Sequence, residues 1–378
     1  MSERILAAYS PGELRTALVR GETLLDYALH HPADPDGVGD LHLARVQAVL
    51  PALGGAFLEL GGSGGAQSGF LPENEVARPL AEGDVLGVRI TRSAQGGKGP
   101  RLSALLDERE SRIIADAAGR RGLASRGPDP LDVLARAHPG LPILCDDPAL
   151  AARLHGEFAS RVRLVSTAFD EAVEEQVAGL ASPRVELPGG LSASITPTPA
   201  LVAIDLDTGP ASDSRLAKQA AQFAANRTAL PALLHQLRLR DLSGAILIDP
   251  AGLAQRKRPQ LRPVIETALA ADPGRPRLVG FTGLGLIEIV RPRIRTPLHE
   301  RLARPHAAAA AALRAARAAM LPPGSARVTV CGGSAVIAAL EADEAARADF
   351  ARLSPAGLVP VLRLDAALQT LAWRIEHG

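Results

Sequence analysis

Two apolar segments of the sequence each end in an aspartate. Residues 201–205 read Leu-Val-Ala-Ile-Asp, and residues 245–249 read Ala-Ile-Leu-Ile-Asp. Short apolar runs of this kind are typical of buried strands. Asp207 follows Asp205 by two residues, so both side chains would lie on the same face of an extended strand. Carboxylates at the carboxyl ends of adjacent strands face the crevice where α/β proteins bind their ligands.

Three such carboxylates would make an all-oxygen site for Mg²⁺, with Mn²⁺ as the alternative metal. A metal held there can activate water and stabilise negative charge on a phosphoryl group. The competing interpretation is that strand-terminal aspartates cap the helix or turn that follows them. The pattern of residues leaves both interpretations open.

Basic residues surround the second aspartate in the sequence. Residues 236–244, which include Arg238 and Arg240, join a long helical pattern to the second apolar strand. More basic residues follow downstream: Arg256, Lys257, Arg258, Arg262, Arg291, Arg293 and Arg295. They either complement a helix dipole and face solvent, or form a positive surface that contacts a phosphate backbone.

Residues 40–105 contain short apolar runs separated by glycine-rich turns such as Gly61–Gly65. Regular short strands of this kind predict a small barrel of the OB type. Phe57 and Phe70 lie in this segment, in a chain with only seven phenylalanines. A lone phenylalanine usually packs in a core, whereas exposed aromatic residues on an OB barrel stack nucleic-acid bases.

The remaining elements predict an α/β core. Residues 3–30 are interpreted as a strand, a helix and a strand, and a βαβ rhythm begins at residue 141. Helical patterns span 147–160, 171–180, 216–239 and 306–320, and residues 106–140 are charged, rich in Gly and Pro, and weakly periodic.

Composition limits the classes of protein that fit. The 378 residues suffice for two to three domains, and the 42 basic residues nearly balance the 41 acidic ones. This balance excludes a uniformly basic nucleic-acid binder but not a local phosphate-binding track. We find no apolar run long enough to span a membrane and no secretory signal. Cys145 and Cys331 stand far apart, so we expect a cytoplasmic protein without structural zinc.

The sequence resembles the ribonuclease E/G family over residues 1–105 and about 141–300. The matching stretches are 17–19, 52–72, 98–102, 187–205, 226–249 and 283–293. The resemblance implies an α/β (α+β multidomain) protein in which an S1-type OB barrel is inserted into an α/β catalytic core with RNase H-like and DNase I-like parts. The domains it implies are the RNase H-like subdomain (1–35 and 141–185), the barrel (36–105), a reduced 5′-sensor or linker (106–140), the DNase I-like catalytic domain (186–320) and a small C-terminal α/β appendage (321–378).

The function implied by this resemblance is a metal-dependent endoribonuclease that cuts single-stranded RNA, in RNA processing or decay, and leaves 5′-phosphate products. Asp205 and Asp249 would be catalytic and hold Mg²⁺. Asp207, which stands where the family usually has Asn, would be a further ligand. The residues that would contact RNA are Phe57, Phe70, Lys98, Arg126, Arg238, Arg240, Arg291 and Arg293.

Three departures from the family pattern qualify this expectation. Residues 106–140 are too short for the family's 5′-end sensor, of which Arg126 would be a remnant. Cys331 lacks the second cysteine of the family's zinc link, so we expect no zinc, and any homo-oligomer would not be zinc-linked. Residues 250–253 and Thr228 replace an aromatic and two acidic residues of the family. The alternative is therefore a catalytically weak or inactive RNA-binding paralogue, while an α/β phosphoesterase for small molecules is disfavoured by the barrel and the arginines.

Overall fold

The chain forms two compact units in the computed structural model, which describes residues 2–61, 68–117, 119–208, 215–320, 328–354 and 357–377. The barrel unit comprises residues 35–133 and 293–296, and the α/β unit comprises residues 1–34, 134–292 and 297–378. Most of the predicted glycine-rich turn at Gly61–Gly65 lies outside the described residues.

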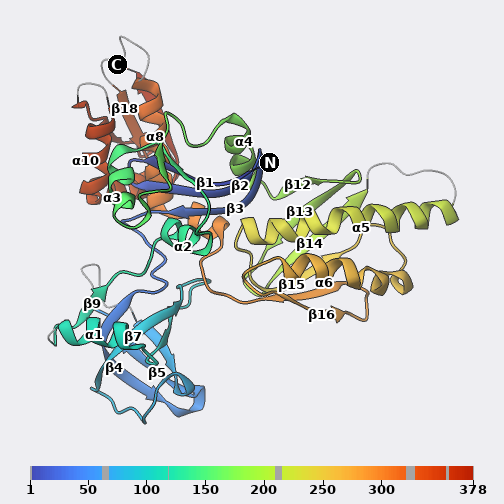
Figure 1. The fold of residues 1–378 in the computed structure, drawn as a ribbon, viewed down its shortest axis with the longest axis horizontal. Helices are drawn as coiled ribbons and strands as arrows, with labels where there is room; N and C mark the ends of the chain where they lie inside the picture. The colour runs from blue at the N-terminus through green and yellow to red at the C-terminus, as the bar shows by residue number, and fades with distance from the viewer. Residues whose placement is uncertain are drawn as a thin grey trace. The chain divides into compact units, whose positions relative to one another are not determined.

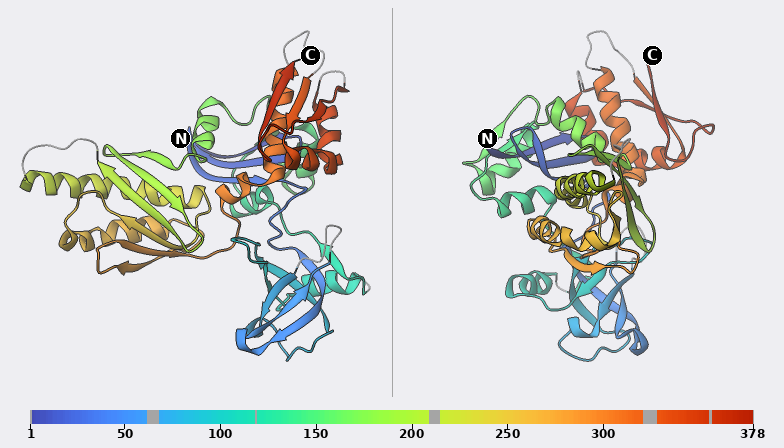
Figure 2. Two further views of the ribbon diagram at one scale, coloured as in Figure 1. Left: turned by 180° about the vertical axis from the view of Figure 1, so that it is seen from behind. Right: turned by 90° about the vertical axis from the view of Figure 1, so that its right-hand side faces the viewer.

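Five strands of the barrel unit form a closed barrel, drawn in blue and cyan in Figure 2. They are β4 (Leu41–Leu50), β5 (Gly55–Glu59), β6 (Ser68–Pro72), β7 (Val85–Arg92) and β8 (Arg101–Ser103), with short 3₁₀ turns η1 (Pro51–Leu53) and η2 (Glu73–Glu75). The strand order is β5-β6-β8-β7-β4, and pairing of β5 with β4 closes the ring. Leu58, Leu71 and Leu102 are fully buried inside it. The small barrel predicted from the sequence is confirmed.

The segment 106–140 is more ordered than a linker. Helix α1 (Glu108–Asp116) begins at a capping box in which Asp107 and Glu110 exchange hydrogen bonds. Strand β9 (Gly122–Ser125) extends the sheet by pairing with β4, and helix α2 (Pro130–Ala137) follows. Gly87 leaves room for α1, since a Cβ there would lie 2.8 Å from Ile114. The linker interpretation is therefore wrong for this segment.

The N-terminal sheet of the α/β unit contains strands β1 (Glu3–Ser10), β2 (Glu13–Arg20), β3 (Thr23–His30), β10 (Ile143–Cys145) and β11 (Val162–Leu164). Their order is β11-β10-β1-β2-β3. The helix predicted between residues 3 and 30 is wrong, because Glu13–Arg20 is a strand buried at seven of eight positions. A strand covered on both faces loses the alternation by which strands are recognised. Gly12 and Gly21 supply positive φ at the turns on either side of it. Helices α3 (Pro148–Phe158) and α4 (Glu171–Gly179) confirm the βαβ rhythm expected after residue 141.

The second sheet carries the predicted carboxylates. Its strands are β12 (Arg184–Leu187), β13 (Leu191–Pro197), β14 (Leu201–Thr208), β15 (Gly244–Asp249), β16 (Arg277–Phe281) and β17 (Ile287–Arg291), in the order β12-β13-β14-β15-β17-β16. Helices α5 (Arg215–Leu239) and α6 (Arg262–Ala270) lie side by side and pack against this sheet (Figure 1). Leu230, Leu233 and Ile265 pack in one core with Ile204 and Ile248. One face of the sheet is thus covered, and the alternate side chains of β14 and β15 are left on the other.

The last part of the chain is a small α/β layer, as predicted. Helices α7 (Leu298–Leu302) and α8 (Pro305–Met320) precede β18 (Val328–Gly332), α9 (Ser334–Ala342), α10 (Glu344–Leu353), β19 (Val361–Leu364) and β20 (Trp373–His377). The strand order is β19-β18-β20, and Val330, Leu340 and Phe350 lie in its core. In the described part of the chain, no helix is both long enough and apolar enough to cross a membrane.

Helix α8 is joined to the N-terminal sheet by a buried ion cluster. Glu13, which is 3% exposed, accepts a hydrogen bond from Arg314 of α8. The Arg15 Nε and the His31 Nε2 each lie 3.5 Å from a carboxylate oxygen of Glu13. Burial opposes ionisation of Glu13, but the neighbouring His31, Arg314 and Arg15 hold the pKa of this carboxyl below its ordinary value.

Candidate functional site

Asp205 and Asp249 lie directly opposite each other on adjacent parallel strands, β14 and β15. Adjacent strands are about 4.8 Å apart, so the two side chains leave neighbouring backbone positions at the carboxyl ends of both strands. Asp205 is exposed and Asp249 half-buried. On the other side of Asp205, β13 places Ser194 in the same row. The predicted pairing of the two aspartates is confirmed.

Asp207 lies on the same face as Asp205, one row further along β14, where its cross-strand neighbour is Ser192. The shared face was predicted, but the structure does not bring Asp207 into the pair. Among the described residues, no group of three or more His, Cys, Asp or Glu side chains is close enough to hold a metal ion. The carboxylate set for a cation is therefore Asp205 and Asp249, smaller than the three ligands expected.

Two carboxylates still fit a magnesium ion in chemical terms. Mg²⁺ keeps several waters and is commonly held by one or two carboxylates together with phosphate oxygens of the substrate. The donors are all oxygen, and the exposure of Asp205 leaves room for water and substrate.

Arg258 fixes one oxygen of Asp249. Its Nη1 lies 2.9 Å from Asp249 Oδ1 and 3.1 Å from the carbonyl oxygen of Gly285, and its Nε donates to the carbonyl of Leu253 at 2.9 Å. Arg258 belongs to the 3₁₀ turn η3 (Gln255–Leu261), just beyond the loop that follows Asp249. The sequence marked it only as one member of a basic run, and its contact with the carboxylate was missed.

The loop after Asp249 is held by amide side chains of α5. Asn226 is fully buried, donates to the carbonyls of Gln222 and Ala251, and accepts the Ala251 N–H at 3.1 Å. Gln219 donates to the carbonyl of Gly252 and accepts the Ala254 N–H. These bonds satisfy the buried backbone of the loop. Asn226 entered the sequence analysis only through the family resemblance, and Gln219 had no signal there.

Gly252 allows α5 to approach this loop. Its φ is +57°, and a Cβ added there would lie 2.1 Å from the Gln222 Nε2. A side chain at position 252 would need both a left-handed backbone and a shift of the Gln222 amide.

Three arginines predicted to contact RNA are used within the α/β unit instead. Arg238 pairs with Asp26 at 2.7 Å. Arg240 is 6% exposed and donates to the carbonyls of Gly179, the last residue of α4, and of Ser182 just beyond it. Arg291 is 7% exposed and pairs with Asp272 at 2.8 Å and Asp241 at 3.3 Å.

Burial lowers the pKa of Arg240. Its guanidinium meets the dipoles of backbone carbonyls rather than a carboxylate. Burial also opposes the charge of Arg291, but its hydrogen bond to Asp272 and the charges of Asp241 and Asp272 raise its pKa overall. Both guanidinium groups serve the fold, which corrects the expectation that they form a phosphate-binding surface.

Phe57 and Phe70 face outward from the barrel. They are direct neighbours on β5 and β6, and their rings meet edge to face with centroids 5.4 Å apart. Their chain neighbours Ala56, Leu58 and Leu71 point into the core, while both phenylalanines stay half-exposed. The core interpretation is wrong for this pair, and a partly exposed aromatic pair on a barrel is suited to base stacking.

The other basic residues predicted to bind RNA lie in the barrel unit. Lys98 is exposed in the hairpin between β7 and β8. Arg293 is half-buried in the segment 293–296, which bonds to the barrel through Ser93 N–H and the Ile294 carbonyl at 2.8 Å. Arg126 pairs with Asp40 at 2.7 Å, although most of its side chain is exposed. Their contact with RNA stays a prediction.

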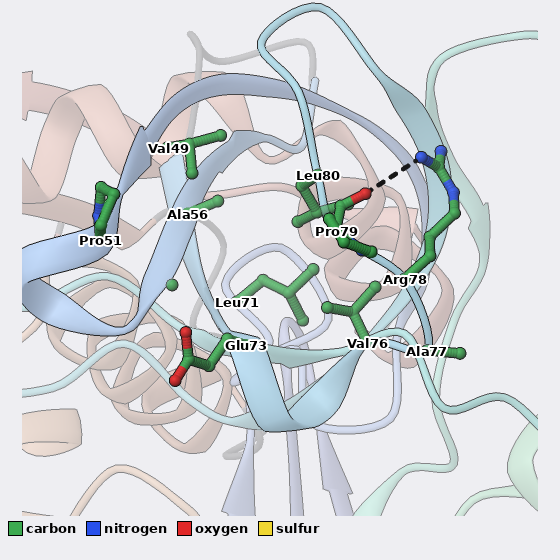
Figure 3. A pocket seen from close by; sticks show the side chains of 11 residues that line it. Val49, Pro51, Ala56, Leu71, Glu73, Val76, Ala77, Arg78, Pro79 and Leu80 are labelled. Atoms are coloured by element: carbon green, nitrogen blue, oxygen red, sulfur yellow. Dashed lines mark hydrogen bonds between the residues drawn. The ribbon is translucent and has the colours of Figure 1, made fainter.

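A cavity of about 460 Å³ opens in the barrel beside β5, β6 and the residues that follow η2. Its lining is mainly apolar, with Val49, Leu71 and Leu80 among the side chains drawn in Figure 3. Arg78 at its rim donates to the carbonyl of Pro79, and Glu73 adds a carboxylate. This lining does not suit a polyanion, so we do not place RNA in this cavity.

Comparisons with known proteins point to one family. The model of the ribonuclease E/G family matches residues 149–294. Ribonuclease E of Escherichia coli (strain K12) is 24% identical over 402 residues, which cover 79% of this chain and 38% of that protein. Ribonuclease G of the same strain is 23% identical over 395 residues, which cover 78% of this chain and 81% of that protein.

A shorter and stronger match is found with Ribonuclease E of Nostoc sp. (strain PCC 7120), 40% identical over 114 residues, or 29% of this chain and 16% of that protein. The chain thus spans less than half the length of the ribonuclease E relatives that it matches.

Proposed function

The chain belongs to the ribonuclease E/G family, and we propose that it is a metal-dependent endoribonuclease that cuts single-stranded RNA in the cytoplasm, in RNA processing or decay. The observation that carries the proposal is the Asp205–Asp249 pair at the carboxyl ends of two adjacent parallel strands. In this proposal the five-stranded barrel is of the S1 type, and the two larger sheets are the RNase H-like and DNase I-like parts of the catalytic core.

Mg²⁺, when bound by Asp205 and Asp249, supplies an activated water and charge stabilisation at the scissile phosphate. Arg258 holds Asp249 in place through one carboxylate oxygen and leaves the second oxygen for the cation. Asn226 and Gln219 hold the loop that follows Asp249, so the carboxylate keeps its position relative to Asp205. The exposed Arg256, on η3, supplies positive charge close to the pair in sequence. The expected products carry 5′-phosphates.

RNA binding is assigned to the barrel in this proposal. Phe57 and Phe70 present ring surface on which bases can stack. Every nucleotide has a base with a flat face, so such stacking does not depend on sequence. Lys98 adds a cation in the exposed hairpin. Binding to the barrel and cleavage at the carboxylate pair are therefore separate tasks of separate residues.

A second candidate function is an RNA-binding paralogue that does not cleave. The ion pair of Arg258 with Asp249 favours it, because it neutralises one of the two carboxylates without any metal. The loop 250–253, which carries no acidic residue, favours it too.

Cleavage of a 5′-monophosphorylated, 3′-fluorescein-labelled oligoribonucleotide in Mg²⁺ tests the proposal. We expect Asp205→Asn and Asp249→Asn to slow cleavage at least about a thousandfold, since the metal contributes several kcal/mol and each 1.36 kcal/mol is tenfold. Asp207→Asn is the matched control: it removes a carboxylate from the same face, one row away, and we expect it to stay within about tenfold of wild type.

The two functions give different results in this experiment. If wild-type protein shifts the RNA in a gel but leaves it intact in both Mg²⁺ and Mn²⁺, the nuclease proposal fails and the binding paralogue stands. If Asp207→Asn is as defective as Asp205→Asn, the two-carboxylate assignment is wrong.

A further inference from the structure

Four side chains form one row across the outer face of the barrel. The register pairs Phe57 with Phe70, Phe70 with Arg101, and Arg101 with Arg92, across strands β5, β6, β8 and β7. Residues that pair directly on neighbouring strands point to the same face of a sheet. The row therefore reads aromatic, aromatic, cation, cation, with about 4.8 Å between neighbouring strands.

A third arginine joins the end of this row. The backbone N–H of Ser93, the residue after Arg92, donates to the carbonyl of Ile294, the residue after Arg293. The hydroxyl of Thr296 donates to that of Ser93 at 3.1 Å. These bonds hold Arg293 beside Arg92. Burial, together with the charges of Arg101 and Arg293, lowers the pKa of Arg92.

Several arginines of the barrel unit are ion-paired. Arg78, Arg89 and Arg295 pair with Asp84, Glu110 and Asp36, respectively. Arg92, Arg101 and Arg293 form no ion pair with any residue that the structure describes. Like charges gathered without a carboxylate repel one another, so an anion from outside the chain would stabilise this arrangement.

Two side-chain donors, one at the end of β7 and one in the hairpin that follows it, also lack acceptors. Within the described residues, the Nε of Arg92 and the Nε2 of Gln95 are shielded from solvent and have no hydrogen-bond partner. Gln95 lies in the hairpin that joins β7 to β8, where its backbone pairs with that of Lys98. A buried donor left without an acceptor costs about 1–3 kcal/mol.

We propose that Arg92, Arg101 and Arg293 form a phosphate-binding site that holds an internal phosphodiester of single-stranded RNA, with the adjoining base stacked on Phe70. The site rests on the proposed RNA substrate and specifies where the barrel grips it. Phe70 and Arg101 are one strand apart, so one nucleotide brings its base to the first and its phosphate to the second. The aromatic neighbour distinguishes this site from one built for a free inorganic anion.

The test measures binding without cleavage. Anisotropy of a 3′-fluorescein-labelled decauridylate, in EDTA and over a range of NaCl concentrations, gives the salt dependence of the affinity. The double variant Arg92→Gln/Arg101→Gln is compared with Arg78→Gln/Arg112→Gln, which removes the same number of charges from the same unit at ion-paired positions. The decauridylate is prepared in two forms, one with a 5′-hydroxyl and one with a 5′-phosphate, and each protein is titrated with both.

We expect the first double variant to flatten the slope of log K against log [NaCl] by at least about 0.7, the value for one phosphate contact on a single strand. The control double variant should keep the wild-type slope. The single variant Arg101→Lys should keep most of that slope, because it retains the positive charge. Both RNA forms should respond alike, since an internal phosphate is common to them. Thermal unfolding should show the first variant at least as stable as wild type, because a repulsion has been removed.

Equal slopes for the two double variants would overturn the proposal, as would a loss confined to the 5′-phosphorylated RNA. A lowered unfolding temperature of Arg92→Gln/Arg101→Gln would count against it too, since it would show that these arginines stabilise the fold. Because the measurement uses EDTA, its result does not depend on catalysis: failure of the nuclease proposal leaves this site standing, and failure of this site leaves the carboxylate pair untouched.

Discussion

The arginines of the two units differ in what they contact. In the α/β unit, Arg238, Arg258 and Arg291 pair with carboxylates of their own chain. In the barrel unit, Arg92, Arg101 and Arg293 have no carboxylate partner among the described residues. The basic run around Asp249 looked like the phosphate-binding surface, but Arg238, Arg258 and Arg291 are ion-paired, whereas, in the part of the chain that the structure describes, three neighbouring arginines of the barrel are not.

For the two buried arginines of the α/β unit, burial explains the internal contacts. A guanidinium that leaves solvent needs compensating charge or carbonyl dipoles. Among the buried arginines, Arg240 donates to backbone carbonyls and Arg291 pairs with Asp272. A half-exposed arginine keeps part of its hydration, so it is tolerated without an internal partner and stays available to bind an external anion. A positive stretch of sequence therefore does not reveal which guanidinium groups are available.

Arg291 and Arg293, two residues apart and one in each unit, give the sharpest test of this contrast. Arg291→Gln leaves Asp272 buried without its partner and should lower the free energy of unfolding by about 3–5 kcal/mol. Arg293→Gln removes the same charge but no ion pair, so its unfolding should match wild type. Urea unfolding followed by circular dichroism measures both.

The same two substitutions should also differ in their effect on RNA affinity, but with the order of severity reversed. Arg293→Gln should weaken binding, while folded Arg291→Gln should bind as wild type does. Equal effects of the two substitutions on stability would show that the contrast between the units is not real.

Phe70 and its neighbour Leu71 extend the contrast to apolar residues. Phe70→Ala should cost about 1–3 kcal/mol of RNA-binding free energy, the usual value for one stacked base. Leu71 is fully buried, so Leu71→Ala should instead destabilise the fold by about 2–5 kcal/mol. Titration of labelled RNA and thermal unfolding of both variants check this. Unchanged affinity in Phe70→Ala would return that ring to a packing role.

Glu13 offers a smaller, pH-dependent effect in the α/β unit. Its folded pKa lies below its ordinary value of 4.5, so its ionised form contributes stability that is fully present above that value and is lost as the pH falls through the folded pKa. The stability difference between wild type and Glu13→Gln should be constant from pH 7 to about pH 5 and shrink at lower pH. Urea unfolding at pH 7 and pH 4 measures it; a difference that grows toward pH 4 would contradict the assignment.

Much of the architecture followed from local pattern. The runs 201–205 and 245–249 are apolar with a terminal aspartate, and both became neighbouring parallel strands. The helix expected at 216–239 appears as Arg215–Leu239. Strand β2 was mistaken for a helix because its burial on both faces removes the alternation on which recognition depends.

The fine structure of the sites depended on contacts distant in sequence. The partners of Arg291, Asp241 and Asp272, precede it by 50 and 19 residues, and no local pattern predicts which carboxylate it meets. The row from Phe57 to Arg92 needs the order of four strands and the register of each pair. The bulge between Ile90 and Arg92, which sets the last step of this row, has no distinct signal in the sequence.

The most direct test of the division of labour measures binding and single-turnover cleavage in the same two variants, Asp205→Asn and Phe70→Ala. Asp205→Asn should bind RNA in EDTA with wild-type affinity and lose cleavage in Mg²⁺. Phe70→Ala should bind about five- to 150-fold more weakly yet cleave near the wild-type rate once RNA saturates it. Cleavage by Asp205→Asn at the wild-type rate would contradict the assignment of the carboxylate pair as the catalytic centre.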